Sequence, residues 1–258
     1  MKTPLFPADD AAHAQFPERR RLLRTGAALV GSALFGSVMA RPAAARAAPA
    51  ASAGRANAGG RGGKALIVNA HQRHAGISEG RLNWTMAALI GTELEAKGFE
   101  VDTTVIDSGY DTQQEVDKHL WADVIVTQSP VFWFGNPWIY KKHVDDVFTA
   151  GLVQGSFLAG DGRSAGDPSA QYGSGGELQG KRYLLSLTMN SPQAAFDDPA
   201  QALHQGRSLD EVFAANTANY RFCGAEVLPV FACYDVVSAP QVASDMQRLK
   251  LHLEQHVG

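Results

Sequence analysis

The sequence predicts a doubly wound α/β fold, in which helices cover both faces of a five-stranded parallel sheet. Five short stretches are predicted to be strands, and the first is an unbroken apolar run of the kind found in strands that are buried on both faces. The stretches between them place apolar residues at helical spacing. Because the two patterns alternate along the chain, they favour parallel strands joined by helical crossovers.

The strands are predicted from the apolar runs, the first of which reads Lys64-Ala-Leu-Ile-Val-Asn69. Runs of four to eight residues without alternation are typical of strands in the middle of a parallel sheet. The predicted strands span residues 64–69, 101–106, 123–128, 182–189 and 227–234.

The helices are predicted from apolar periodicity and from end signals. In the first, Leu82, Met86, Ile90 and Leu94 fall on one face, and Gly98 is placed to end the helix. The third has Pro137 in its first turn. The fourth opens with Ser208 and Glu211, the two residues of a capping box. The predicted helices span residues 80–97, 113–120, 137–148, 208–222 and 240–255.

Charge divides the chain into a basic start and an acidic body. Residues 1–63 hold nine basic and three acidic residues, a net charge of +6. Since the whole chain carries −3, residues 64–258 carry −9. A body of this charge repels nucleic acid and anionic lipid, so we expect no nucleic-acid partner.

The first 47 residues have the three parts of an export signal. A basic stretch with Arg19 and Arg20 precedes the apolar run 25–40, and Ala45-Arg46-Ala47 supplies a small-residue cleavage site. The run is short for a stable membrane span. The order Arg19-Arg20-x-Leu22-Leu23-Arg24 is similar to a twin-arginine signal, which serves proteins that are exported already folded. We therefore expect a signal over 1–47, a flexible Ala- and Gly-rich leader over 48–63 and a periplasmic or exported body over 64–258. The alternative is a basic tail or a mis-assigned start codon on a cytoplasmic protein.

Three loops are expected to form the ligand site, because ligands of doubly wound sheets bind where strand order reverses, at the carboxyl ends of the strands. The first loop, residues 70–80, leads into a helix N-terminus, where free N–H groups favour a phosphate. It lacks the glycine spacing of known nucleotide loops. A plain surface loop capped by Ser78 remains the alternative.

The second loop gathers aromatic side chains at a strand end. Phe132, Trp133, Phe134 and Trp138 suit contact with a flat heteroaromatic ring such as a flavin. A hydrophobic plug or a dimer contact is the alternative interpretation. The third loop, 188–192, offers amide and hydroxyl groups beside the ring.

The chain has no catalytic constellation of its own. The motifs HExxH and CxxC are missing from the sequence, and no metal site is expected. Cys223 and Cys233 are interpreted as buried apolar residues, with a single disulfide as the alternative. The aromatic loop is suited to a flat cofactor, and the chain lacks catalytic groups of its own. Together these two observations indicate that a cofactor performs the chemistry.

Residues 64–258 resemble the NADPH:quinone reductases of the modulator-of-drug-activity-B type, in the flavodoxin-like quinone reductase superfamily. Ordered motifs carry the resemblance, above all Tyr172-Gly-Ser-Gly-Gly176. The others are Leu120-Trp-Ala-Asp-Val124, Gly135-Asn-Pro-Trp138, Lys141-Lys142, Asp145-Asp-Val-Phe148, Asp161-Gly-Arg163, Lys181 and the segment from Leu184 to Thr188.

The resemblance implies bound FAD, hydride transfer from NAD(P)H through flavin N5 to a quinone, and a homodimer with the site near the subunit interface. It implies that the FAD pyrophosphate is held by Ser78, Glu79, Gly80, Arg81, Leu82, Asn83, Trp84 and Thr85. It implies that the flavin face meets Val131, Phe132, Trp133 and Phe134, that Tyr172 closes over the cofactor, and that the ring edge meets Thr188, Met189, Asn190 and Ser191.

The sequence departs from the family pattern near the expected acceptor site. Val131 replaces a usual glycine, Phe132 and Met189 stand where tryptophan is common, and the first loop is about one residue longer. These differences predict a reshaped acceptor pocket.

Several functional alternatives remain open at this point. The acceptors are quinones or nitro and azo compounds, and Tyr172 and His204 are candidate proton relays. The cofactor alternative is FMN. Outside enzymes, the chain would be an exported flavin-binding electron carrier that serves a protein partner, or a structural protein with an empty switch point.

Overall fold

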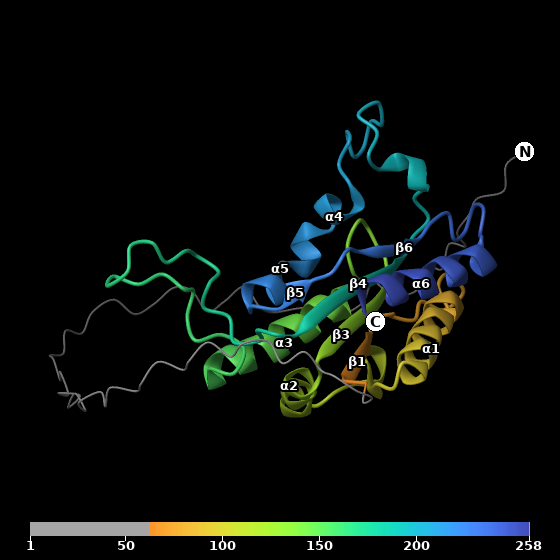
Figure 1. Cartoon of the computed structure of the whole chain (residues 1–258). Coiled ribbons are helices and arrows are strands. Elements are labelled where there is room, and N and C mark those ends of the chain that lie inside the picture. The colour runs from red at the N-terminus through yellow and green to blue at the C-terminus, as the bar shows by residue number, and fades with distance from the viewer. Residues whose placement is uncertain (1–61, 258) are drawn as a thin grey trace, which may run out of the picture. The chain divides into compact units, whose positions relative to one another are not determined.

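The computed structural model describes residues 62–257, so the predicted signal and nearly all of the predicted leader lie outside the described residues. Six parallel strands form one sheet in the order β2-β1-β3-β4-β5, and β6 also pairs with β4 (Figure 1). This is the predicted doubly wound arrangement. The strands are β1 (Lys64–Asn69), β2 (Glu100–Val105), β3 (Val124–Pro130), β4 (Arg182–Thr188), β5 (Glu226–Val227) and β6 (Phe231–Cys233).

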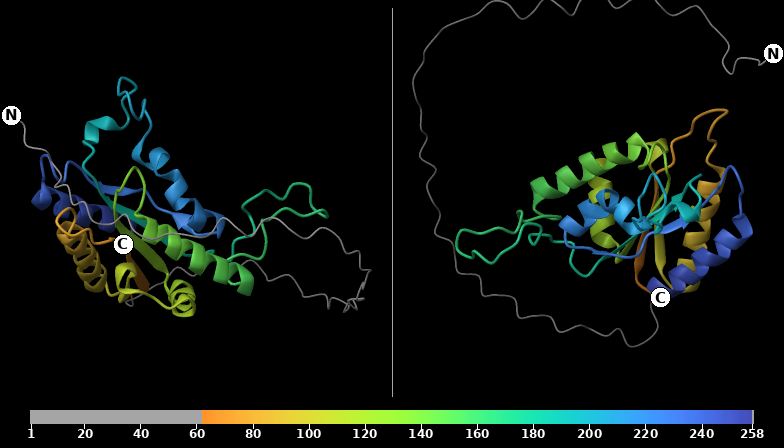
Figure 2. Two further views of the ribbon diagram at one scale, coloured as in Figure 1. Left: turned by 180° about the vertical axis from the view of Figure 1, so that it is seen from behind. Right: turned by 90° about the horizontal axis from the view of Figure 1, so that it is seen from above.

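The helices lie on both faces of the sheet (Figure 2). They are α1 (Arg81–Ala96), α2 (Thr112–Trp121), α3 (Trp138–Gln154), α4 (Leu209–Val212), α5 (Ala214–Phe222) and α6 (Val242–His256), with 3₁₀ turns η1 (Ile106–Ser108) and η2 (Gln193–Ala195). One apolar core packs α1 and α6 against the sheet, and the other packs α2, α3 and α5 against the opposite face. No helix in residues 62–257 is long and apolar enough to cross a membrane.

The predicted fifth strand is two short strands, a difference that Pro229 explains. Proline has no N–H for the sheet ladder, so the chain leaves the sheet between β5 and β6. Val230 then donates its N–H to Asp210 Oδ1 at 2.8 Å instead of to a strand. The predicted helix 208–222 is likewise interrupted at Phe213, although Ser208 and Glu211 form the predicted capping box.

Helix α3 continues six residues beyond its predicted end at 148. The continuation includes Gly151, where a Cβ would lie 2.4 Å from the ring of Phe157. This glycine therefore serves the packing of the following loop and does not end the helix. The helix ends at Gly155, whose φ of 68° is left-handed.

Glycines of the Tyr172-Gly-Ser-Gly-Gly176 motif permit close packing of the insertion between α3 and β4. A Cβ on Gly175 would lie 2.1 Å from the Gly160 carbonyl oxygen, and one on Gly176 would lie 2.1 Å from the Cys223 backbone. The insertion is thus fixed to the end of α5, at the edge where the strands begin. Figure 1 shows it in green, extending beyond the end of α3.

A buried polar cluster joins α2, α3 and α5 beneath the sheet. The carboxylate of Glu115 accepts hydrogen bonds from Thr104 Oγ1 at 2.7 Å and His143 Nε2 at 3.0 Å. Burial alone raises the pKa of Glu115, but these hydrogen bonds outweigh burial and hold that pKa below its usual range. His119 Nδ1 donates to the Glu115 carbonyl at 2.7 Å, so Nε2 accepts from the Tyr220 hydroxyl at 3.0 Å.

The position of His119 predicts acid-sensitive stability. Burial in the core lowers the pKa of His119 from 6.5 to about 4, so the folded protein holds this ring neutral. The unfolded chain binds the proton from pH 6.5 downward, and stability falls between pH 6.5 and 4 by about 3 kcal/mol at most. Urea unfolding of the parent and of His119→Gln across this range measures the effect. The variant should show a flatter dependence on pH, and equal slopes would contradict the assignment to His119.

Both cysteines are free and buried, as expected. Burial raises the pKa of Cys223 to about 11 and that of Cys233 to about 12. Neither thiol is therefore reactive at neutral pH.

Candidate active site

The strand order reverses between β1 and β3, and the loops that follow these strands meet at the carboxyl edge of the sheet. Asn69 and Gln128 are register partners at the strand ends, and Ala70 N donates to the Gln128 carbonyl at 2.9 Å. The first and second loops therefore begin side by side. This geometry puts the predicted loops at the ligand position of a doubly wound sheet.

A buried amide network holds the three central strands together beneath this edge. Asn83 Nδ2 donates to Asn69 Oδ1 at 2.9 Å, and Gln128 Nε2 donates to Asn83 Oδ1 at 3.0 Å. Ser186 on β4 donates to Gln128 Oε1 at 2.7 Å. Asn83 is only 2% exposed, so its side chain lies below the site surface and braces the loop bases.

The first loop leads to a helix start that lacks a side-chain cap. Helix α1 has Gly80 as its N-cap, with a φ of 80° and no side-chain hydrogen bond. The alternative interpretation, in which Ser78 caps the helix, is therefore wrong, because Ser78 Oγ lies 3.2 Å from His71 Nε2 instead. A Cβ on Gly80 would lie 2.4 Å from the His71 ring, which accounts for the glycine. The free N–H groups of the first helical turn are suited to a phosphate.

His71 presents a neutral ring beside this helix start. Burial lowers the pKa of His71 and outweighs the opposing effect of Asp107. Its backbone N–H donates to Asn69 Oδ1 at 3.1 Å. The residue is thus fixed through both its ring and its backbone.

Glu79 stabilises the outer part of the same loop. Its carboxylate accepts from Gly76 N at 2.9 Å and from Arg73 Nε at 2.7 Å. These two bonds hold the pKa of Glu79 below its usual value. Arg81, Trp84 and Thr85 are exposed along the first turns of α1, whereas Leu82 is half-buried against the core.

The second loop is a tight hairpin with aromatic residues at its tip. Phe132 N donates to the Gly135 carbonyl at 2.7 Å, and Trp133 and Phe134 take left-handed φ values of 52° and 66°. Such conformations are strained for bulky residues and cluster at functional sites. Trp133 is 86% exposed, which leaves its ring available to a ligand. Val131, half-buried, fixes the hairpin base by donating to the Thr188 carbonyl at 2.8 Å.

The third loop contributes mainly support. Thr188 and Met189 are buried, and Met189 is 2% exposed. Asn190 Oδ1 accepts from Val237 N and Ser238 N, so this amide braces the loop after β6. The Ser191 carbonyl accepts from Asp235 N at 3.2 Å.

The two candidate proton relays lie in different surroundings. Tyr172 packs on Phe222 with ring centroids 5.1 Å apart, at the opposite edge of the sheet. The structure therefore does not bring Tyr172 to the loops of its own chain. His204 follows β4 but is buried, with its ring stacked on Phe196 at 4.6 Å.

Three buried polar atoms in and beside the first two loops lack a hydrogen-bond partner within residues 62–257. They are Asn69 Nδ2, Gln72 Oε1 and Asn136 Nδ2. Buried polar groups are normally paired, so two donors and one acceptor left open at this edge fit a polar ligand. Together with the uncapped helix and the exposed rings, they fit a flavin with its phosphate. Sequence reasoning did not assign these three side chains to the site. The only signal for them in the sequence is their position in or close to the loops that follow strands.

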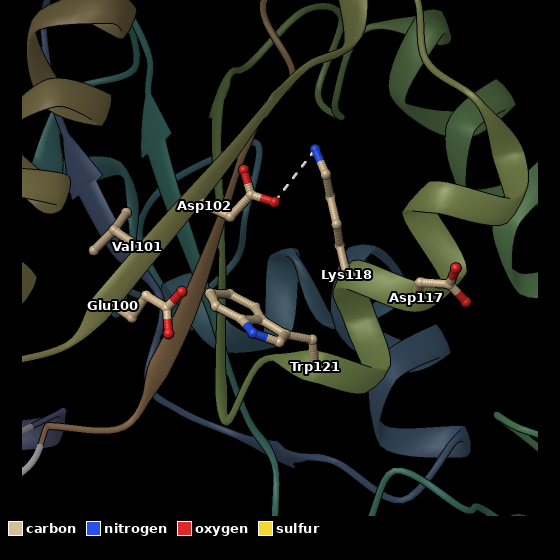
Figure 3. Close-up of a pocket in the computed structure, with 6 residues that line it drawn as sticks. All are labelled: Glu100, Val101, Asp102, Asp117, Lys118 and Trp121. Carbon is tan, nitrogen blue, oxygen red and sulfur yellow. Dashed lines mark ion pairs between the residues drawn. The ribbon is translucent and has the colours of Figure 1, made fainter.

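A surface pocket of about 440 Å³ lies away from the candidate site, between the edge strand β2 and α2. In it Lys118 points toward Asp102, with Nζ 3.6 Å from Oδ2 (Figure 3). Charged side chains of this kind protect a sheet edge from pairing with other chains. In the part of the chain that the structure describes, no group of three His, Cys, Asp or Glu side chains is placed to hold a metal ion.

Comparison with known proteins identifies the family. A sequence profile described as "Flavodoxin-like fold" matches residues 63–257. NADPH:quinone oxidoreductase MdaB of Haemophilus influenzae is 39% identical over 183 residues, which are 71% of this chain and 94% of the relative. The chain belongs to the flavodoxin-like quinone reductase superfamily. This confirms the resemblance seen in its motifs.

Another relative and two solved structures match this chain over a similar extent. A protein of Schizosaccharomyces pombe is 39% identical over 195 residues, which cover 76% of this chain and 97% of that protein. A putative quinone reductase from Klebsiella pneumoniae superposes with a TM-score of 0.59 at 21% identity, covering 74% of this chain and 84% of that one. The general stress protein 14 of Treponema denticola, solved in complex with FMN, gives 0.52 at 19% identity and covers 74% and 98%. These two structures support the fold alone.

Proposed function

We propose that the chain is an FAD-dependent NAD(P)H:quinone oxidoreductase. Membership of an oxidoreductase flavoprotein family supports redox chemistry. The observation that carries the proposal is the meeting, at the switch point, of an uncapped helix start and a hairpin with exposed aromatic rings. A phosphate and a flat ring of one ligand would occupy these two neighbouring features.

Each loop has a distinct part in holding the cofactor. The N–H groups after Gly80 would bind phosphate, with Ser78 and Arg81 beside them. Trp133 and Phe134 would contact the ring face. The open polar atoms of Gln72 and Asn136 would meet polar groups of the ligand.

Bound flavin supplies two-electron hydride transfer from NAD(P)H to a quinone, or to nitro and azo acceptors. The chain's own side chains bind and orient the reactants, and the aromatic hairpin excludes water from them. His71 lies beside the start of α1, where its ring would serve as a hydrogen-bond partner for the phosphate.

The cofactor choice between FAD and FMN is tested on the purified protein. Residues 48–258 are purified, the visible spectrum is recorded, the released flavin is identified by chromatography, and menadione-dependent oxidation of NAD(P)H is followed. We expect a yellow protein that releases FAD. A protein that takes up neither flavin would end the redox assignment, and release of FMN would replace FAD in it.

The exposed position of Tyr172 supports a homodimer. Tyr172 is 69% exposed and lies at the edge opposite the other candidate residues. In a dimer, Tyr172 of one protomer would close over the cofactor of its partner. Light scattering gives the mass, and a monomer that retains full reductase activity would contradict this arrangement.

Export as a folded protein is proposed from the signal-like start of the chain. A reporter fused to residues 1–47 should be secreted, and Arg19→Lys with Arg20→Lys should abolish that secretion, because a twin-arginine signal depends on these residues. Secretion that persists in the double variant would remove the assignment. If export is lost in the double variant as expected, the electron donor outside the cytoplasm is identified by comparing NADH and NADPH with reduced protein partners.

A further inference from the structure

The first and second loops are joined by a pair of stacked rings. The imidazole of His74 lies parallel to the ring of Phe132, with centroids 4.9 Å apart and planes inclined by 5°. His74 follows β1, whereas Phe132 follows β3. The contact therefore connects the two sides of the switch point.

Each ring is anchored by its own loop. His74 N donates to the Ser78 carbonyl at 2.9 Å, and Ser78 N donates back to the His74 carbonyl at 2.8 Å. Phe132 N donates to the Gly135 carbonyl at 2.7 Å. Because these bonds lie within the separate loops, we expect either loop to keep its backbone geometry when the stack is lost.

The stack lies between the two loops that flank the switch point. The crevice at a switch point lies between the loops that follow the two diverging strands. A ring pair that connects those loops narrows the crevice mouth. Phe132 keeps 39% of its surface exposed, so its outer face is open to an incoming molecule.

We propose that His74 is a positioning residue that holds Phe132 across the mouth and thereby limits the size of the acceptors that enter. This inference rests on the proposed function and extends it to acceptor selection. The stack admits quinones of one ring and disfavours wide fused-ring quinones. His74 acts through Phe132 and takes no part in the transfer itself.

The test compares acceptors of two widths on the flavin-loaded full chain. Duroquinone has one ring, and phenanthrenequinone has three fused rings. We expect His74→Ala to lower the KM for phenanthrenequinone about tenfold relative to that for duroquinone, with little change in the ratio of kcat values. His74→Phe, which keeps a stacking ring, should restore the parent ratio.

A control and a second measurement separate this inference from the proposed function. Ile77→Ala changes an exposed residue of the same loop and should leave the ratio unchanged. Quenching of tryptophan fluorescence by each quinone, without NAD(P)H, gives the same comparison as dissociation constants. If the ratio of the two quinone dissociation constants shifts in His74→Ala but the protein has no turnover, the reductase assignment is contradicted and size selection by His74 and Phe132 is supported. If that ratio is unchanged in His74→Ala, or if His74→Phe does not restore it, size selection by His74 and Phe132 is wrong, whatever the turnover.

Discussion

Replacing Trp133 by alanine is expected to weaken flavin binding by about 10- to 100-fold without unfolding the protein. Stacking of an aromatic side chain on a flat heterocycle contributes about 1 to 3 kcal/mol. Since Trp133 is 86% exposed, its removal leaves no cavity in the core. Titration of apoprotein with flavin, followed by flavin fluorescence, measures the change, and circular dichroism checks the fold.

A tryptophan outside the site serves as the control for this prediction. Trp121 lines the pocket beside β2, so Trp121→Phe should leave flavin affinity within about twofold. If Trp133→Ala bound flavin as tightly as the parent, the stacking role of the hairpin would be wrong.

Replacing Gln128 by leucine is expected to destabilise the fold by about 2 to 5 kcal/mol, because it disrupts a buried hydrogen-bond network. The change removes both hydrogen bonds of this buried amide and leaves Asn83 Oδ1 and Ser186 Oγ without these partners. A buried polar group that loses its partner costs about 1 to 3 kcal/mol. Urea unfolding of parent and variant measures the difference. Flavin affinity should fall as well, because the network braces the strand ends on which the loops stand.

The matched control is Gln114→Leu on the exposed side of α2. Its side chain makes no hydrogen bond within residues 62–257, so stability should change by less than about 0.5 kcal/mol. Equal stability of Gln128→Leu and Gln114→Leu would show that the network does not brace the sheet.

The first four strands could be predicted from the sequence because each contains a short group of apolar residues, although Asp102, Thr103 and Thr104 interrupt that of β2. The pattern predicts β1 (Lys64–Asn69) to the residue, and the parallel sheet follows from the alternation of strands and helices. The region 227–234 has the same apolar character, yet Pro229 and the hydrogen bond of Val230 to Asp210 divide it. That bond joins distant parts of the chain, and no local pattern reveals it.

For the site, too, features of single loops could be predicted from the sequence, whereas contacts between distant segments could not. Because the loops follow strand ends, the sequence predicts that they and their aromatic residues form the ligand site. The structure brings the first two of these loops together. The burial of Asn83 could not be predicted, because its partners Asn69 and Gln128 belong to two other elements. Tyr172 belongs to a motif that is close in sequence to β4 but lies at the edge where that strand begins. The stack of His74 on Phe132 likewise depends on two loops that only the fold brings into contact.

A crystal structure of the protein grown with excess FAD would show whether the cofactor lies at this edge of the sheet. We expect the pyrophosphate at the start of α1 and the isoalloxazine ring against Trp133 and Phe134 of the hairpin. A structure in which flavin is bound elsewhere, or not at all, would refute the proposed site.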